Sequence, residues 1–261
     1  MKKAILFSLL GISFVISSCK KEEAPEFTNI STERKSLLID FTATWCCPCG
    51  SSLPIFNEVK SRYPYKVVPL ALHASSDSFY NPQMYWHWAN IYDVTGIPSY
   101  VADNQHISWG YVLPDLHLDT SHFYEVINAT LHATPPACGI GINKEIVGNT
   151  MTVKTKTVFF SEASGELSLA IYITEDGLFF DQNCSDDDIH NHVFRASLTD
   201  PNGEGTLLIN GTAAKGKTFD NTFTFTIPAD YVKENLHVIA VVYKLDPAVA
   251  KPIAILNVNN I

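Results

Sequence analysis

Three cysteines lie within four positions of the segment "TWCCPCG", which spans residues 44–50. Cys46 and Cys49 form a C-x-x-C pair, and apolar side chains follow at the spacing of an amphipathic helix: Leu53, Phe56, Val59 and Tyr63. At the start of such a helix, unpaired N–H groups and the helix dipole would lower the pKa of the Cys46 thiol from about 8.5 to roughly 3.5–7.5. Cys49, one turn later, could bond to Cys46 or resolve a mixed disulfide. The spacing therefore predicts a dithiol–disulfide redox centre.

Two other interpretations of this pair compete with the redox centre. A zinc site commonly uses four ligands, often two C-x-x-C pairs, and the chain has a single such pair. We therefore expect neither a metal nor another cofactor. A purely structural Cys46–Cys49 disulfide is the stronger alternative if the chain is exported, because exported proteins use disulfides as staples.

The remaining cysteines and one acidic loop give weaker signals. Cys138 and Cys184 are predicted to form a structural disulfide, although pairing cannot be deduced from sequence alone. Cys47 is then left over and could be a second reactive thiol within the site. The stretch "NCSDDDIHNHV" offers side chains that could bind a cation, but a polar loop explains them as well and is the favoured interpretation. These side chains are Asp186, Asp187, Asp188, His190 and His192.

The first 18 residues have the pattern of an export signal. "MKK" is a positive start, and "AILFSLLGISFVISS" is apolar but too short for a membrane-spanning helix. The following "ISSC" resembles the lipobox of bacterial lipoproteins, which implies cleavage before Cys19 and lipid attachment to it. An ordinary secreted protein is the alternative. Residues 19–33 are predicted to be a solvated tether, and "KEE" within them resembles the export signal of Bacteroidetes lipoproteins. That resemblance implies the outer membrane, facing the periplasm or the cell surface.

The charge of the chain argues against nucleic acid as a partner. The formal net charge is −9, and Lys2 and Lys3 would leave with the signal. No cluster of Lys and Arg remains, whereas phosphate binding needs concentrated positive charge.

Residues 34–133 predict an α/β domain around the cysteines. "SLLIDFTA" and "KVVPLALHA" are apolar runs of strand length, as expected for strands of a sheet that is covered on both faces. Three segments have the pattern of helices, beginning near Ser51, Asn81 and Asp119, and "SYVADNQHISWGYV" has the pattern of a hairpin. This order of elements predicts helices on both faces of a central sheet.

Residues 134–261 predict a second, all-β domain. Pro135 and Pro136 would stop a helix and start a linker. About seven alternating or β-branched segments follow, each bounded by turn residues. This pattern is typical of an antiparallel, immunoglobulin-like sandwich.

Two stretches resemble the thioredoxin family. In "LLIDFTATWCCPC" and the later Pro54, an acidic residue, a tryptophan, a C-x-x-C pair and a proline recur in the order and spacing of the thioredoxin active site. "VTGIPSYV" resembles the segment of that family whose cis-proline faces the cysteines, here Pro98 after Ile97. The resemblance implies a thioredoxin fold with Cys46 as the nucleophile and Cys49 as the resolving cysteine.

The same resemblance implies roles for four neighbouring residues. Asp40 would be a buried carboxylate that takes a proton from Cys49, and burial should raise its pKa toward neutrality. Ile97 and Pro98 would flank the substrate groove, where backbone groups can pair with an extended peptide, and Trp45 would shield one side.

The chain also departs from the thioredoxin pattern at two positions of this motif. Cys47 stands in place of a glycine between the active cysteines, and Gly50 stands in place of the usual basic residue after the second one. The substrate range and reduction potential of thioredoxin therefore cannot be assumed for this chain.

A lipoprotein signal, a thioredoxin-like domain and a β-sandwich, together with the segment "IHNHVFRA", resemble the outer-membrane-protein-28-related lipoproteins of Bacteroidetes. We therefore expect a lipid-anchored, extracytoplasmic thiol/disulfide oxidoreductase that reduces or isomerises disulfides of exported proteins. Reduction would require an electron donor, which the sequence does not identify. The alternative is a surface binding or adhesion lipoprotein in which the thioredoxin fold is only a scaffold.

Overall fold

The computed structural model describes residues 27, 29–107, 111–112, 117–118, 120–133, 135–248 and 251–261. The predicted signal segment, residues 1–18, and the predicted lipidation site, Cys19, lie outside the described residues. At the end of the predicted tether, the side chain of Asn29 exchanges two hydrogen bonds with the backbone of Ile142, at 2.7 and 3.1 Å. The chain is thus already packed on the β-rich region at this point. Among the described residues there is no helix of the length and apolarity that crossing a membrane requires.

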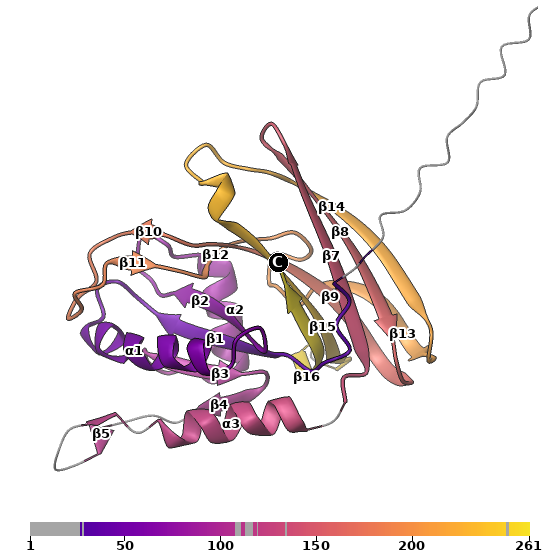
Figure 1. Cartoon of the computed structure of the whole chain (residues 1–261), viewed down its shortest axis with the longest axis horizontal. Helices are drawn as coiled ribbons and strands as arrows, with labels where there is room; N and C mark the ends of the chain where they lie inside the picture. The colour runs from indigo at the N-terminus through magenta and orange to yellow at the C-terminus, as the bar shows by residue number, and fades with distance from the viewer. Residues whose placement is uncertain are drawn as a thin grey trace, which may run out of the picture.

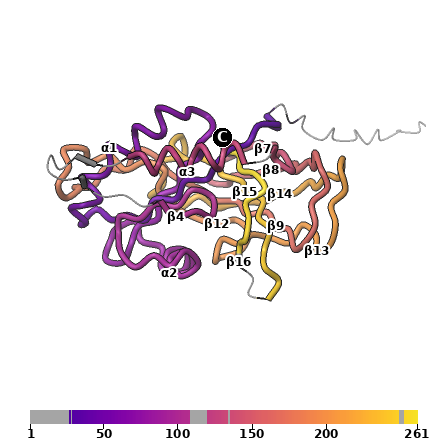
Figure 2. The backbone as a smooth tube through the Cα atoms, turned by 90° about the horizontal axis from the view of Figure 1, so that it is seen from below, coloured from indigo at the N-terminus to yellow at the C-terminus, as the bar shows by residue number. Residues whose placement is uncertain are grey.

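The α/β region, residues 36–132, contains a mixed sheet with helices on both faces. Strands β1 and β2 are parallel, whereas β3 pairs antiparallel with β1 and with β4. Helices α1 and α3 cover one face and α2 covers the other (Figure 2). The described elements of this region are β1 (Ser36–Thr42), α1 (Cys47–Arg62), β2 (Val67–His73), α2 (Pro82–Ile91), β3 (Ser99–Ala102), β4 (Gln105–Ile107), β5 (Tyr111–Val112), β6 (His117–Leu118) and α3 (Ser121–His132).

Strand β1 is mostly apolar, and its residues from Ser36 to Phe41 are all buried. Leu38 packs with side chains of α1 and α3, whereas Ile39 and Phe41 point to the side of α2. Asp40 therefore points to the same face as Leu38, beneath α1, since side chains alternate along a strand. Because helices cover both faces of the sheet, a polar side chain on β1 is buried whichever face it takes, and its burial costs free energy.

The β-rich region, residues 138–261, is a sandwich. Strands β7, β8 and β14 form one antiparallel sheet, which packs on β9 and β15 through a buried apolar cluster. Its elements are β7 (Cys138–Val147), β8 (Thr150–Phe159), β9 (Ala163–Glu175), β10 (Leu178–Phe179), β11 (Ile189–His190), β12 (Val193–Ser197), β13 (Thr206–Ala213), β14 (Thr218–Thr226), the 3-10 turn η1 (Lys233–Asn235), β15 (Leu236–Asp246) and β16 (Lys251–Asn260). Strand β13 and the β10–β11 hairpin are additions to the strands that the sequence pattern predicts.

Among the described residues, one nine-stranded sheet runs through both regions, and Figure 1 shows β12 between them. Strand β12 is the link, because it pairs with β9 on one side and with β2 on the other, where Val193 lies opposite Ala71. The central strand β9 is consequently buried on both faces. Ile171 faces the sandwich core, whereas Tyr172 faces the core beneath α2.

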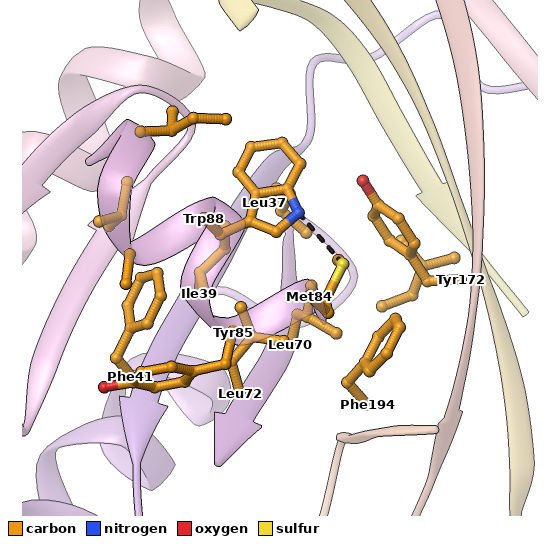
Figure 3. Close-up of a cluster of buried hydrophobic side chains, with 14 of the residues drawn as sticks. Leu37, Ile39, Phe41, Leu70, Leu72, Met84, Tyr85, Trp88, Tyr172 and Phe194 are labelled. Carbon is orange, nitrogen blue, oxygen red and sulfur yellow. Dashed lines mark hydrogen bonds between the residues drawn. The ribbon is translucent and has the colours of Figure 1, made fainter. Parts of the chain in front are cut away.

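The core beneath α2 contains side chains from both regions (Figure 3). Trp88 of α2 lies beside Met84, and Tyr172 and Phe194 of the β-rich region approach from the opposite side. The Trp88 ring centroid is also 5.6 Å from that of Tyr243 on β15. The two regions are therefore joined by a shared apolar core as well as by the sheet.

Candidate redox site

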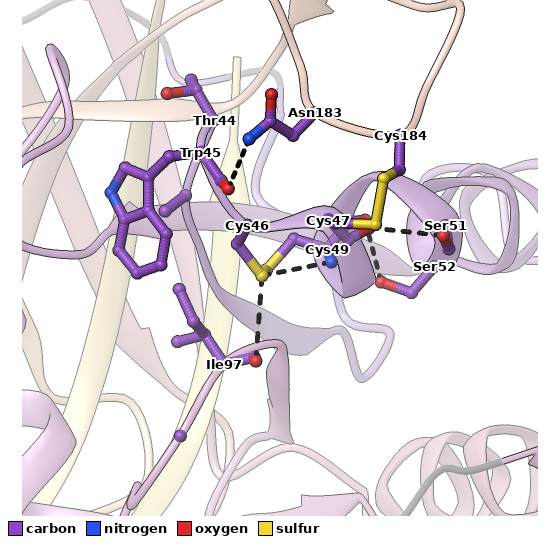
Figure 4. The surroundings of a disulfide bond; sticks show 12 residues. Thr44, Trp45, Cys46, Cys47, Cys49, Ser51, Ser52, Ile97, Asn183 and Cys184 are labelled. Atoms are coloured by element: carbon purple, nitrogen blue, oxygen red, sulfur yellow. Dashed lines mark hydrogen bonds between the residues drawn. A yellow bond between two sulfur atoms is a disulfide. The ribbon is translucent and has the colours of Figure 1, made fainter.

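Cys46 and Cys49 are joined by a disulfide at the N-terminus of α1 (Figure 4). Cys46 is the N-cap residue, and its sulfur accepts a hydrogen bond from the backbone N–H of Cys49 at 3.2 Å. Pro48 fits the first turn because that turn needs no N–H from it. The free N–H groups and positive dipole end of α1 thus surround Cys46, where they favour a thiolate over a thiol.

The peptide bond between Ile97 and Pro98 is cis and lies beside this disulfide. The Cys46 sulfur is 3.8 Å from the carbonyl oxygen of Ile97. Figure 4 shows the two residues facing each other. On another side Trp45 is 46% exposed, and its indole N–H donates to the carbonyl of Ser75 at 3.0 Å. The structure therefore brings the predicted residues Trp45, Cys46, Cys49, Ile97 and Pro98 together.

Asp40 is buried behind the disulfide. Its side chain and Cys49 line one cavity of about 40 Å³, which is large enough to hold water. Within the described part of the chain, Asp40 Oδ1 has no hydrogen-bond partner, and burial raises the pKa of the carboxyl to about 8. A carboxyl with a pKa near neutrality can both take and return a proton at working pH.

A second buried aspartate, Asp77, holds the loop before the cysteines. Its Oδ2 accepts from the backbone N–H of Thr44 at 2.6 Å and lies 3.1 Å from Nδ1 of His73. Burial alone would raise the pKa of Asp77, but the His73 ring and the backbone N–H groups of Phe79 and Thr44 outweigh it and lower the pKa to about 2. Asp77 is therefore held as a carboxylate that anchors the loop, whereas burial favours the neutral form of Asp40.

The structure corrects the predicted pairing of the other cysteines. Cys47 is bonded to Cys184, not left as a free thiol, and Cys138 is a free, buried cysteine. Cys138 lies at the start of β7 with its side chain in the sandwich core, where burial raises the pKa of its thiol to about 12. Cys184 belongs instead to an exposed loop that reaches the start of α1, so it meets Cys47.

Residues 180–192, called here the docked segment, lie against the loop that carries the cysteines. The backbone N–H of Asn183 donates to Thr44 O at 2.9 Å, and its side-chain amide donates to Trp45 O at 2.7 Å. Gln182 is buried and directs its side-chain amide at the same loop. A Cβ on Gly50 would lie only 2.2 Å from the Asn183 carbonyl oxygen, so this close approach requires glycine.

The other end of the docked segment is anchored to α1 by His192. Its Nε2 contacts the Lys60 ammonium, and its Nδ1 lies 3.2 Å from Oδ1 of Asp176. Burial lowers the pKa of His192 to about 4, although the Asp176 carboxylate opposes this shift. The ring is therefore neutral near pH 7, which leaves Nε2 free to accept the Lys60 hydrogen bond.

The sequence model of the family described as outer membrane protein Omp28 matches residues 87–260, which is more than half of the chain. The chain belongs to the outer membrane protein Omp28 family. A thioredoxin model matches residues 18–105 and therefore covers the cysteine motif. Both predicted resemblances are thus confirmed, and membership in the Omp28 family places the protein at the outer membrane.

Solved structures share this two-region layout with the Omp28-family chain. HBP35 of Porphyromonas gingivalis superposes with a TM-score of 0.69 at 17% identity, over 88% of this chain and 76% of that chain. A protein of Agrobacterium tumefaciens superposes with a TM-score of 0.54 at 12% identity, over 88% of this chain and 95% of that chain. At these identities the likeness shows the fold alone.

Curated relatives match short parts of the chain. A thioredoxin H-type of Chlamydomonas reinhardtii is 32% identical over 59 residues, which are 23% of this chain and 52% of that protein. A thioredoxin H-type of Oryza sativa subsp. indica is 36% identical over 52 residues, which are 19% of this chain and 43% of that protein. The Omp28-family chain thus spans about half the length of the curated relatives it matches.

In this Omp28-family chain the acidic stretch of the docked segment forms turns. Asp187 accepts from the backbone N–H of Ile189 at 3.1 Å, and Asp188 accepts from that of Gln182 at 2.9 Å. His190 Nε2 lies 2.9 Å from the Phe180 carbonyl oxygen. These contacts give the side chains local partners, as the favoured polar-loop interpretation predicts.

Sequence reasoning missed Asp77, Gln182 and Asn183 as neighbours of the cysteines. Each acts on the backbone of the cysteine loop, and no short motif marks such a contact. The one available signal was Gly50, since a glycine in the first turn of a helix can indicate that another segment comes close.

Proposed function

We propose that this protein is a thiol/disulfide oxidoreductase of exported proteins. The observation that supports it most is the joint placement of the Cys46–Cys49 disulfide beside cis-Pro98 and in front of the buried Asp40, whose Oδ1 has no hydrogen-bond partner among the described residues. A scaffold has no need of an uncompensated buried carboxyl, whose burial is costly. Reduction or isomerisation of substrate disulfides is the reaction proposed.

The proposed reaction starts from the reduced pair. The Cys46 thiolate attacks one sulfur of a substrate disulfide, and the other substrate sulfur leaves as a thiolate that takes a proton from solvent. Asp40 then takes the proton of the Cys49 thiol, and the Cys49 thiolate attacks Cys46 in the mixed disulfide. The substrate leaves with both sulfurs reduced, and Cys46–Cys49 is oxidised by two electrons. A dithiol donor outside the chain must return these electrons.

Lipid attachment at Cys19 is part of the same proposal. It is supported by the apolar segment that ends in "ISSC" and by membership in an outer membrane protein family. A Cys19→Ala variant should lose incorporation of labelled fatty acid and move from the membrane fraction to the soluble fraction. Unchanged labelling would overturn the assignment.

Trapping and redox titration test the proposed activity. Cys49→Ser should accumulate mixed disulfides through Cys46 with exported proteins, whereas the control Cys46→Ser/Cys49→Ser should capture none. In glutathione buffers, peptide mass spectrometry after alkylation separates this pair from Cys47–Cys184. A potential between about −180 and −270 mV is expected, the range from disulfide isomerases to reducing thioredoxins. A potential below about −300 mV, which is typical of structural disulfides, together with no trapped partner would contradict the proposed activity and favour the scaffold interpretation.

A further inference from the structure

Gln182 comes from the β-rich region but directs its side chain at the backbone that carries Cys46. Its Nε2 lies 3.3, 3.1 and 3.2 Å from the carbonyl oxygens of Ala43, Thr44 and Cys46. The residue is buried and also lines the cavity that Asp40 and Cys49 share. Nε2 is also 3.3 Å from the carbonyl oxygen of Asn183, so the two N–H groups of this amide are shared among four carbonyl oxygens, three of them in the cysteine loop.

Gln182 is fixed from both directions along the chain. Its backbone N–H donates to Asp188 Oδ1 at 2.9 Å, and the next residue, Asn183, makes two hydrogen bonds to the cysteine loop. One residue further on, Cys184 is bonded to Cys47. The disulfide thus prevents this part of the docked segment from leaving the start of α1.

The backbone carbonyl dipoles of residues 43, 44 and 46 affect the balance between thiol and thiolate at Cys46, and the sign of the effect depends on their direction. A carbonyl oxygen is the negative end of its dipole, and a negative end near a sulfur disfavours the thiolate. A donor that binds the oxygen offsets part of this negative charge. The Cys46 carbonyl already accepts from the N–H groups of Cys49 and Gly50 at 3.1 and 3.2 Å, and the Gln182 amide adds a donor from outside the helix.

We propose that Gln182 is a positioning residue of the redox centre, held against the Cys46 loop by the Cys47–Cys184 disulfide. It acts through the backbone of residues 43–46 and does not itself touch the reacting sulfur atoms. The proposal rests on the thiol/disulfide function above and adds that the β-rich region completes the site.

The test compares Gln182→Met with Gln83→Met in the otherwise unchanged protein. Methionine keeps the length of the side chain but removes the amide. Gln83 is a matched control because its amide also joins the two regions, by donating to Asn202 Oδ1 at 3.2 Å and not to the cysteine loop. In protein whose Cys46–Cys49 pair is reduced and whose Cys47–Cys184 disulfide is kept intact, the pH dependence of Cys46 alkylation, followed by peptide mass spectrometry, reports the pKa of that thiol alone.

Gln182→Met should raise the pKa of Cys46, so that at a pH below that pKa the thiolate fraction, and with it the rates of alkylation and disulfide exchange, falls about three- to tenfold. Gln83→Met should change neither. An unchanged Cys46 pKa in a folded Gln182→Met protein would overturn the proposal. If the wild type shows no disulfide exchange but the Cys46 pKa still differs between the wild type and Gln182→Met, only the proposed activity is wrong.

A second variant covers the case in which Gln182→Met does not fold. Cys47→Ser/Cys184→Ser removes the covalent tether and leaves Gln182 in place. The Cys46 pKa should rise in the same direction by a smaller amount, and amide hydrogen exchange of residues 181–185 should accelerate. If neither quantity changes, the disulfide does not hold Gln182 and that half of the proposal is wrong.

Discussion

Three buried aspartates show how the surroundings of one residue determine its chemistry. Asp77 is surrounded by donors, and Asp103 pairs with Arg34 at 2.7 Å. In the part of the chain that the structure describes, Asp40 Oδ1 has neither kind of partner, and burial raises the pKa of the carboxyl. A lone buried carboxyl is expensive for the fold, and this cost is the physical reason to connect Asp40 with proton transfer.

This cost predicts a pH-dependent effect of Asp40→Asn. The carboxyl has a pKa of about 8 in the folded protein, against an ordinary value of 3.8 for an aspartate in an unfolded chain. Between these values the unfolded chain loses the proton and the folded protein keeps it, so Asp40 lowers the free energy of unfolding by about 1.4 kcal/mol per pH unit as pH rises. Below both values, and above both, its contribution is constant.

Asp40→Asn should therefore gain stability relative to the wild type as pH rises from about 5 to 8, and little more from 8 to 9. Urea unfolding of the two oxidised proteins across this range measures the difference, in which all other titrating groups largely cancel. A difference that stays flat with pH would mean that Asp40 is not buried without compensation.

At the scale of elements, the cysteine motif and its helix were predictable because they depend on local chemistry. The apolar spacing after Cys49, Pro48 at the start of α1 and the cis-proline segment are all short-range signals. The partner of Cys47 was not predictable in this way. It depends on where β12 joins the sheet, and strand alternation fixes which face a residue takes but not which strand lies next to it.

The contact between α1 and the docked segment predicts the effect of Gly50→Ala. Alanine favours a helix over glycine by about 1 kcal/mol, but its Cβ would meet the Asn183 carbonyl oxygen at 2.2 Å. The Cys47–Cys184 disulfide limits how far the segment can retreat. We expect a net loss of about 1–3 kcal/mol in the free energy of unfolding.

Gly96→Ala is the matched control, because a Cβ there meets no other atom within 4 Å. Its free energy of unfolding should change by no more than about 0.5 kcal/mol. Denaturant unfolding of both variants gives the comparison. If the two variants change the free energy of unfolding equally, the docked segment moves away from an added Cβ at no cost, and the close contact with α1 does not require glycine.

At the scale of the whole molecule, the sequence predicts two kinds of region but not the core they share. The near-continuous apolar runs of β9 and β15 indicate strands buried on both faces. The sequence alone does not say what covers the second face. In the structure, α2 covers this second face, and its Trp88 packs in one apolar cluster with side chains of both strands.

A shared core predicts that the two regions unfold together. Trp88 is fully buried, so Trp88→Ala should cost about 3–5 kcal/mol, whereas Trp86→Ala, at a position 53% exposed, should cost far less. Because the core joins α2 to β9 and β15, the loss should also reach strands that Trp88 does not touch. Hydrogen exchange measured by mass spectrometry should show faster exchange in β7 and β8 by the same free energy as in β1 and β2. If Trp88→Ala loosens β1 and β2 but leaves exchange in β7 and β8 unchanged, the regions are independent folding units, and the β-rich region could not hold Gln182 rigidly at the redox site.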